Sequence, residues 1–499
     1  MARSAHERMS SVDTAWLRMD GPAGSMMIVG VSATATPIRP ADFRRMVEQR
    51  LLCFPRFRQR VVADAFGASW VEDADFDLEA HVVTEVLPAP HDQGALQALA
   101  GRLASRPLDP GRPLWQLHLV ERYQGGSAWI TRVHHCYADG IAMIRVLLSM
   151  TEQDPGAAMA PREPAAARRG RPRSKTPGVA GTLGQLEQAV QPAGDIVEHV
   201  LVEGARLLEF SVQGLFHPGQ AAGLAALAGG MAGEFLRVLA LPDDPATPLR
   251  GSMSGEKAVA WGPPIPLHEV QTVGRALGCT VNDVLMATVA GALGACLRER
   301  GHDTQELRLR ASVPVNLRST DEPLTLGNRF GLVFVELVPG IANPLQRLHA
   351  MHGAMAALKG SLQPRASFVS LGLMGLLPGA LQTPLVELFS RKATAVVSNV
   401  PGPRAPLTLC GQRVTEMYFW VPQSGSIGIG VSLLSYAEHV HFGVISDRAL
   451  MPSPAGFVRH FSREFEALVL ATAVGALALR HVPSPRIDTV QQKRRVRAE

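Results

Sequence analysis

A shift of composition in the middle of the chain is the feature that most constrains its fold. Between Asp154 and Gly181 the residues are mainly Ala, Pro, Arg and Gly, which is typical of a flexible, proline-stiffened linker. The segments on either side carry the hydrophobic patterns of helices and strands. A chain of 499 residues is also longer than one that usually folds around a single hydrophobic core. The sequence therefore predicts two comparable α/β halves joined by a long linker.

The patterns divide the chain into five predicted segments. Residues 1–153 form the N-terminal half, 154–182 the basic linker, 183–245 a helical segment suited to associate with a membrane, 246–482 the C-terminal half and 483–499 a basic tail. In the N-terminal half, helical spacing at 41–52 and 94–105 follows a β-rich run at 26–35. The run 115–123 alternates apolar and polar residues, and with a turn at 124–127 and a second strand at 128–133 it predicts a hairpin that leads into His134.

The C-terminal half shows a similar alternation of helical and extended patterns. Helices are predicted at 267–277 and from Asn282 onward. The predicted strands are 258–261, 307–313, 333–337, 393–398, 426–435 and 439–445.

The distribution of charged residues and cysteines limits which classes of protein the chain can belong to. The net charge is +5, and the sequence contains two basic runs, Arg168 to Lys175 and Lys493 to Arg497. Aromatic residues are only 5% and do not interleave with these runs, so nucleic-acid binding is not expected. The five cysteines are scattered without zinc-site spacing, and the N-terminus lacks the apolar core of a signal peptide. We therefore expect a cytoplasmic protein that is not secreted.

Three stretches are long and free of charged residues, but none makes a convincing membrane span. They are Phe210–Gly233, Ala366–Val386 and Met417–Ala437, and each contains prolines or polar residues. The third reads as turn and strand. The first two could lie in a membrane interface or line a lipid-binding groove, or be ordinary buried helices.

The motif His134-His135-Cys136-Tyr137-Ala138-Asp139-Gly140 follows the predicted hairpin, where a loop can present side chains to a cleft. Adjacent residues on an extended chain point to opposite sides, so only one histidine can serve a given site. For the same reason Cys136 is poorly placed to exchange a proton with His135 as a nucleophile. A metal site is disfavoured because no third ligand lies nearby in sequence. Gly140 is expected to adopt a backbone conformation that other residues resist.

HHCYADG resembles the HHxxxDG signature of the CoA-dependent acyltransferase superfamily, and other segments narrow the resemblance to the bacterial wax ester synthase/diacylglycerol acyltransferases. Those segments occur in the family's order over nearly the whole chain. They are SSVDTAWL, FPRFRQRV, FDLEAHV, RPLDPGRPLWQLHLVE, TPLRGSMSGEKAVAW, TVNDVLMA, PVNLR, GNRFG and SNVPGP. The linker is longer and more basic than the family pattern, and Cys136-Tyr137-Ala138 is not the commonest filling of the variable positions.

The resemblance implies two chloramphenicol-acetyltransferase-like domains, each a mixed sheet with helices, and a set of site residues. His135 would be the general base, with no acyl-enzyme, and His134 a packing or loop-orienting residue. Asp139 would pair with an arginine and, with Gly140, shape the loop. Asn282, Asp283 and Asn399 match family motifs without a derived role, and Asn282 could equally be a helix N-cap.

The implied reaction joins a fatty acyl-CoA to diacylglycerol or a long-chain alcohol at a membrane or lipid-droplet surface, with no cofactor besides the acyl-CoA co-substrate. Three alternatives stay open. One is a condensation-type acyltransferase acting on another alcohol or amine. Another is a plant-type alcohol acyltransferase, although SGSIGIG stands where a DFGWG motif would be expected. The last is a non-catalytic lipid-binding droplet protein, since fold does not guarantee activity.

Overall fold

The computed structural model describes residues 7–21, 24–64, 67–152, 233–234, 236–318, 325–377 and 379–480. The predicted linker, both basic runs and the stretch from Phe210 to Met231 lie outside these residues, as do most of the predicted 183–245 helical segment and the basic tail.

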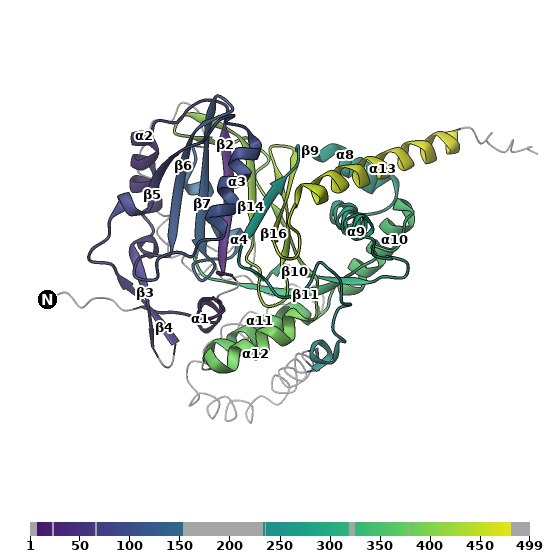
Figure 1. The fold of residues 1–499 in the computed structure, drawn as a ribbon, viewed down its shortest axis with the longest axis horizontal. Coiled ribbons are helices and arrows are strands. Elements are labelled where there is room, and N and C mark those ends of the chain that lie inside the picture. The colour runs from purple at the N-terminus through teal and green to yellow at the C-terminus, as the bar shows by residue number, and fades with distance from the viewer. Residues whose placement is uncertain are drawn as a thin grey trace, which may run out of the picture.

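Two mixed sheets stand side by side, one built mainly by each half of the chain (Figure 1). The first has the strand order β13–β14–β2–β7–β6–β5. Its strands are β13 (Thr408–Leu409), β14 (Gln412–Trp420), β2 (Met27–Thr34), β7 (Gly126–His134), β6 (Trp115–Tyr123) and β5 (Val82–Val86). Only β5 runs parallel to its neighbour. Two strands from beyond residue 400 thus complete the sheet of the N-terminal half.

The second sheet has the order β11–β10–β12–β15–β16–β8, with β9 also paired to β16. Its strands are β11 (Phe330–Leu337), β10 (Leu309–Asn316), β12 (Ala395–Pro401), β15 (Ile429–Tyr436), β16 (His439–Asp447), β8 (Lys257–Trp261) and β9 (Ile265–Pro266). The central strands β10, β12 and β15 run parallel, and the others are antiparallel. A small sheet joins β1 (Glu7–Arg8), β4 (Gly67–Glu72) and β3 (Gln59–Asp64).

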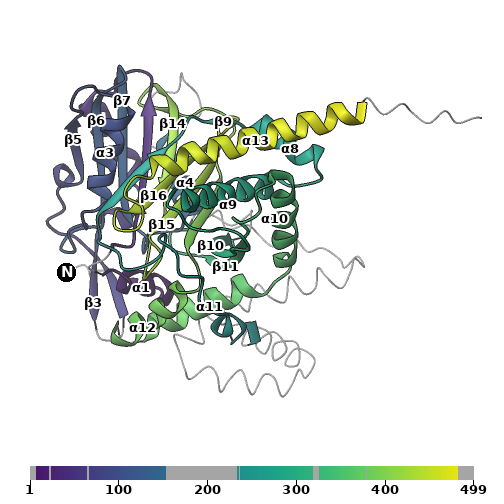
Figure 2. The same ribbon diagram turned by 45° about the vertical axis from the view of Figure 1, so that its right-hand side comes forward.

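Helices pack against both sheets (Figure 2). The N-terminal half contributes α1 (Ser11–Arg18), α2 (Pro40–Met46) with a π-helical turn at Val47–Leu51, α3 (Gln93–Ala104) and α4 (Gly140–Met150). The C-terminal half contributes α8 (Leu267–Ala276), α9 (Val281–Glu299), α10 (Pro344–Leu358), α11 (Gln363–Leu376), α12 (Gly379–Ser390) and α13 (Ala455–Arg480). Thr280 caps the start of α9, and Gly301, with a φ of +76°, follows the C-cap residue Arg300 at its end.

Two hydrophobic cores result. One lies around the first sheet and includes Met417 and Trp420 of β14; the other lies between the second sheet and α8, α9, α10 and α13. Helix α9 is long and apolar enough to cross a membrane, but 78% of its apolar window is buried inside the protein. It is therefore the central helix of the second core.

Most predicted elements are present with shifted ends. Strands β2, β6, β7, β8, β10, β11, β12, β15 and β16 and helices α2, α3, α8 and α9 correspond to predicted runs. The stretch Met417–Ala437, expected to be turn and strand, also contains the end of β14 before its turn and β15, and Ala366–Val386 spans parts of α11 and α12. Strand β14 was not predicted as a separate strand, nor were α10, α12 and α13 predicted as helices.

Candidate active site

A largely apolar cavity of about 390 Å³ opens between the second sheet, α11, α12 and the loop that follows β7. Alternate residues of β11, β10 and β12 form its floor, because side chains along a strand point to opposite faces. They are Phe330, Leu332, Phe334, Ser312, Pro314, Asn316, Val396, Ser398 and Val400. Most of the residues between them, such as Val313, Val333 and Val397, face the second core instead.

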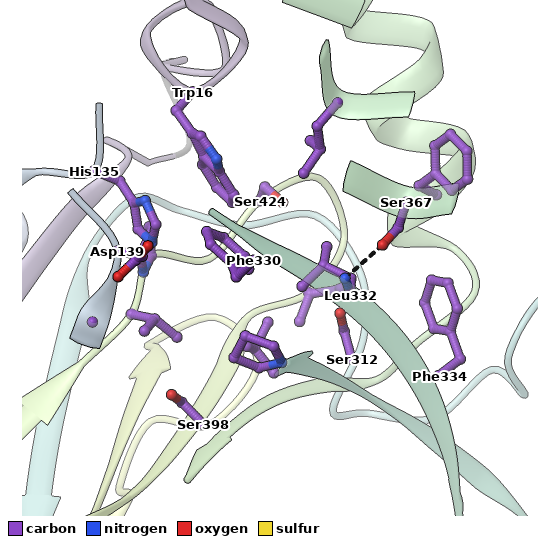
Figure 3. A pocket seen from close by; sticks show the side chains of 18 of the residues that line it. Trp16, His135, Asp139, Ser312, Phe330, Leu332, Phe334, Ser367, Ser398 and Ser424 are labelled. Atoms are coloured by element: carbon purple, nitrogen blue, oxygen red, sulfur yellow. Dashed lines mark hydrogen bonds between the residues drawn. The ribbon is translucent and has the colours of Figure 1, made fainter. Parts of the chain in front are cut away.

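His135 reaches this cavity from the first position beyond β7 (Figure 3). Its backbone N–H donates to the carbonyl of Met26 at 2.7 Å, which fixes the chain as it leaves the sheet. The imidazole stacks on Trp16 with ring centroids 4.3 Å apart and lies 5.5 Å from the ring of Phe330. Its Nδ1 atom is enclosed and has no hydrogen-bond partner among the described residues. Nε2 is therefore the nitrogen that can meet a substrate.

Burial lowers the pKa of His135 to about 4, and the nearby negative charge of Asp139 opposes part of that shift. A ring with this pKa is neutral at physiological pH. It can thus accept a proton in the resting protein, as a general base must.

Asn328 holds the backbone of His135 in place and is itself held by Asp13. The side-chain amide of Asn328 donates to the backbone carbonyl of His135 at 2.7 Å and to a carboxylate oxygen of Asp13 at 2.8 Å. The backbone N–H of Asn328 donates to the same oxygen at 3.0 Å. Burial raises the pKa of Asp13 to about 6, against the lowering effect of these hydrogen bonds.

His134 points to the other side of the strand, as the alternation requires. Its Nδ1 accepts a hydrogen bond from the backbone N–H of Cys136 at 3.1 Å, so the proton of a neutral ring sits on Nε2. That atom lies 3.1 Å from the carboxylate of Asp20. Cys136 is fully buried away from the cavity, and burial raises the pKa of its thiol well above the usual range. The geometry gives Cys136 no nucleophilic role beside His135.

Asp139 shapes the loop, and its predicted arginine partner is Arg318. One carboxylate oxygen accepts from the backbone N–H of Ala142 at 2.9 Å and caps α4. The other accepts from Nε of Arg318 at 3.0 Å and from the backbone N–H of Arg329 at 3.0 Å. Arg318 also donates to the carbonyl of Gly327 at 2.6 Å, which draws the 325–329 loop against the histidine motif.

The expectation about Gly140 is wrong. It begins α4, and it is not among the glycines with positive φ. A Cβ added there would meet Cγ2 of Val400 at 3.7 Å, an ordinary van der Waals distance. The tight geometry of the loop comes from Asp139, whose backbone and side chain make the cap.

A family model described as the wax ester synthase/diacylglycerol acyltransferase catalytic domain matches residues 9–285, and one described as the WS/DGAT C-terminal domain matches residues 326–469. The chain belongs to the wax ester synthase/diacylglycerol acyltransferase family. It is an acyltransferase.

Individual relatives agree with that assignment. A protein of Mycobacterium tuberculosis H37Rv named "probable diacylglycerol O-acyltransferase" is 29% identical over 425 residues, which are 81% of this chain and 82% of that protein. A solved wax ester synthase/diacylglycerol acyltransferase from Marinobacter aquaeolei VT8 has a TM-score of 0.65 at 22% identity, covering 94% of this chain and 100% of that one. The first condensation domain of the calcium-dependent antibiotic synthetase gives 0.60 at 15% identity, covering 94% and 97%. These two structures share the two-domain fold.

The remaining predicted residues of this acyltransferase lie around the start of α9. The amide of Asn399, which lines the cavity, donates to the side-chain oxygen of Asn282 at 2.9 Å and ties β12 to α9. The alternative of Asn282 as N-cap is wrong, because Thr280 is the N-cap. Asp283 completes a capping box with Thr280, and its carboxylate also lies 2.8 Å from Nδ1 of His352.

Cys279, Asp283 and His352 offer ligand atoms within 4.8 Å of one another, a grouping that spacing in the sequence does not reveal. Asp283 already accepts from the backbone N–H of Thr280 at 2.8 Å. The start of a helix also disfavours a cation, because its unpaired N–H groups carry partial positive charge. We therefore interpret this grouping as part of the helix cap.

Sequence reasoning missed the roles of Trp16, Asp13, Asn328 and Arg318. All four lie inside segments that resemble the family, SSVDTAWL, GNRFG and PVNLR, but those segments carry no local sign of which atoms they contact. The contacts join positions up to 315 residues apart, and only the fold brings them together.

Proposed function

We propose that this acyltransferase moves a fatty acyl group from acyl-CoA to the hydroxyl of diacylglycerol or of a long-chain alcohol, with His135 as general base. The observation that carries the proposal is a neutral imidazole that lines a mostly apolar cavity, in which the carboxylate of Asp139 is paired with Arg318. Such a cavity suits an alkyl-bearing acceptor, and the base stands at its edge.

The reaction can proceed in one active site without a covalent enzyme intermediate. Nε2 of His135 takes the hydroxyl proton as the acceptor oxygen attacks the thioester carbonyl. The C–S bond of the tetrahedral intermediate then breaks, and the protonated ring returns that proton to the leaving thiolate of CoA. The chemistry needs no cofactor beyond the acyl-CoA co-substrate.

Three exposed leucines support the proposal that the protein acts at a lipid surface. Leu373 and Leu376 of α11 are 48% and 42% exposed, and Leu236 on the neighbouring helical turn is 63% exposed. Gln363 at the start of α11 donates to Glu234 at 3.2 Å, which holds the two segments together. Because Leu371 and Met374 of the same α11 line the cavity, an acceptor dissolved in lipid would have a short route inward. We propose peripheral association with the cytoplasmic membrane face or with lipid droplets.

The deciding experiment measures CoA release from palmitoyl-CoA with hexadecanol, dipalmitoylglycerol or an amine acceptor. We expect acceptor-dependent release with at least one lipid, and a fall of roughly 10²–10⁴-fold in His135→Ala, the usual contribution of a general base. His349→Ala serves as a control, because His349 is an exposed histidine of α10. Substantial turnover in folded His135→Ala would contradict the mechanism, and turnover with the amine alone would favour a condensation-type reaction.

A further inference from the structure

Two buried serine side chains face the cavity. Ser312 on β10 and Ser398 on β12 are 5% and 2% exposed, and both side chains line the cavity (Figure 3). No hydrogen bond of either hydroxyl is found among the described residues. The hydroxyls of Ser367 and Ser370 on the opposite helix α11, by contrast, donate to backbone carbonyls at 2.9 and 2.7 Å.

Strand register brings these two hydroxyls close to each other. Ser312 pairs with Val396 in the parallel ladder between β10 and β12, and Ser398 lies two residues further along the same face. With strands about 4.8 Å apart and a rise of about 3.3 Å per residue, their Cα atoms are separated by roughly 8 Å. Both lie on a floor whose other members are mostly apolar, so one polar head group could contact the two together.

The cavity also limits the charge of its ligand. Among the described residues that line it, only His135 and Asp139 are titratable, and Asp139 is already paired with Arg318. No lysine or arginine among these residues is available to hold a phosphate or carboxylate. An anionic lipid would lose its hydration there without compensation, so the ligand should be neutral.

We propose that Ser312 and Ser398 donate hydrogen bonds to the ester carbonyls of a neutral glyceride acceptor and so favour it over a plain long-chain alcohol. This inference rests on the proposed function. The methylene chain of an alkanol would leave both buried hydroxyls unpaired, whereas a diacylglycerol carries two ester carbonyls close together. A site built to form hydrogen bonds discriminates against an analogue that lacks the matching groups.

The test compares kcat/KM for dioleoylglycerol and hexadecanol, with palmitoyl-CoA as donor, in the full-length protein. Ser312→Ala and Ser398→Ala should each lower the ratio of diacylglycerol to hexadecanol efficiency about 3- to 10-fold, the worth of one hydrogen bond. Ser398→Thr should restore part of the ratio, because it returns a hydroxyl on a residue suited to a strand. Ser446→Ala is the matched control: its hydroxyl donates to Met451 at 2.7 Å and lies outside the cavity.

Two results would overturn the inference. An unchanged ratio in both alanine variants would show that the hydroxyls do not contact the acceptor. An equal loss with both acceptors would show that they serve the thioester or the fold, which the two reactions share. If the wild-type protein releases no CoA with either acceptor, the proposed function itself fails, which is a different outcome from active protein with an unchanged ratio.

Discussion

Two buried titratable residues at the site, His135 and Asp13, have opposite effects on the free energy of unfolding as pH changes. The pKa of His135 is lowered from its model-compound value of 6.5 to about 4, so its contribution to stability is present above pH 6.5 and is lost as pH falls through 4. The pKa of Asp13 is raised from 3.8 to about 6, so its contribution is present below pH 3.8 and is lost as pH rises through 6. Between pH 4 and 6 the two effects largely offset.

Asp13→Asn should therefore make the protein more sensitive to acid. Without the compensating carboxyl, the His135 contribution falls by about 1.4 kcal/mol per pH unit between pH 6.5 and 4. Urea unfolding at pH 6.5, 5.5 and 4.5 would show a steeper decline of the free energy of unfolding in the variant than in the wild type. Parallel declines would mean that at least one of the two groups titrates near its unperturbed pKa.

Asn328 is expected to position His135 rather than to touch substrate. Its amide holds the backbone carbonyl of His135, and its Oδ1, which has no partner among the described residues, is enclosed like Nδ1 of the ring. Asn328→Ala should lower kcat about tenfold or more while KM changes little, because binding surfaces in the cavity remain. Steady-state kinetics check this, with Asn343→Ala, a helix cap in α10, as control. If instead KM rose about tenfold while kcat stayed unchanged, this result would contradict a positioning role.

At the scale of elements, the loop between β7 and α4 depends on a buried ion pair. Asp139 and Arg318 are almost fully buried, and Arg318→Ala would leave the carboxylate charged and unpaired. Breaking such a pair costs about 3–5 kcal/mol, so the variant should unfold at much lower urea concentration. Arg308→Ala is the matched control: its pair with Glu336 is exposed and should contribute less than about 1 kcal/mol. Similar losses in both variants would show that Asp139 finds another partner.

The elements also show how far the sequence could predict the fold. The hairpin of β6 and β7 before His135 could be predicted because its two strands are adjacent in sequence, are joined by a turn at Gly125-Gly126 and pair with each other. Strand β14 could not, since a register shift between Val414 and Glu416 interrupts its period of two. Helix α11 has no clear apolar stripe, because α1 packs on one side and the cavity lies on another. The structures of both segments therefore depend on contacts with elements that are far away in sequence.

The same reasoning applies to the candidate site. His135 could be singled out because its motif is contiguous and resembles a known signature. The residues that support it, Asp13 and Asn328, could not be singled out. They lie in different halves of the chain, and their side chains meet only in the folded protein. Burial of His135, which sets its pKa, likewise depends on Trp16 and Phe330 from different halves.

At the scale of the whole molecule, the two halves are not independent. Strands β13 and β14 leave the C-terminal half and extend the sheet of the N-terminal half beside β2. Their side chains Met417, Tyr418 and Trp420 are buried, and Tyr418 stacks on Trp261 at 5.1 Å. Without them the N-terminal sheet would expose an unpaired edge and part of its core.

We therefore expect fragments 1–232 and 233–499 to be unfolded or aggregated when each is produced alone. Produced together, they should form a 1:1 complex that turns over acyl-CoA, because all the contacts between the halves can form across separate chains. Size-exclusion chromatography and circular dichroism would measure both states, and a full-length protein cleaved at an engineered protease site near residue 182 is the control. A folded, monomeric 1–232 fragment with cooperative unfolding would show that the first sheet is stable without β14, and that the strand exchange is not needed to build the half that carries His135.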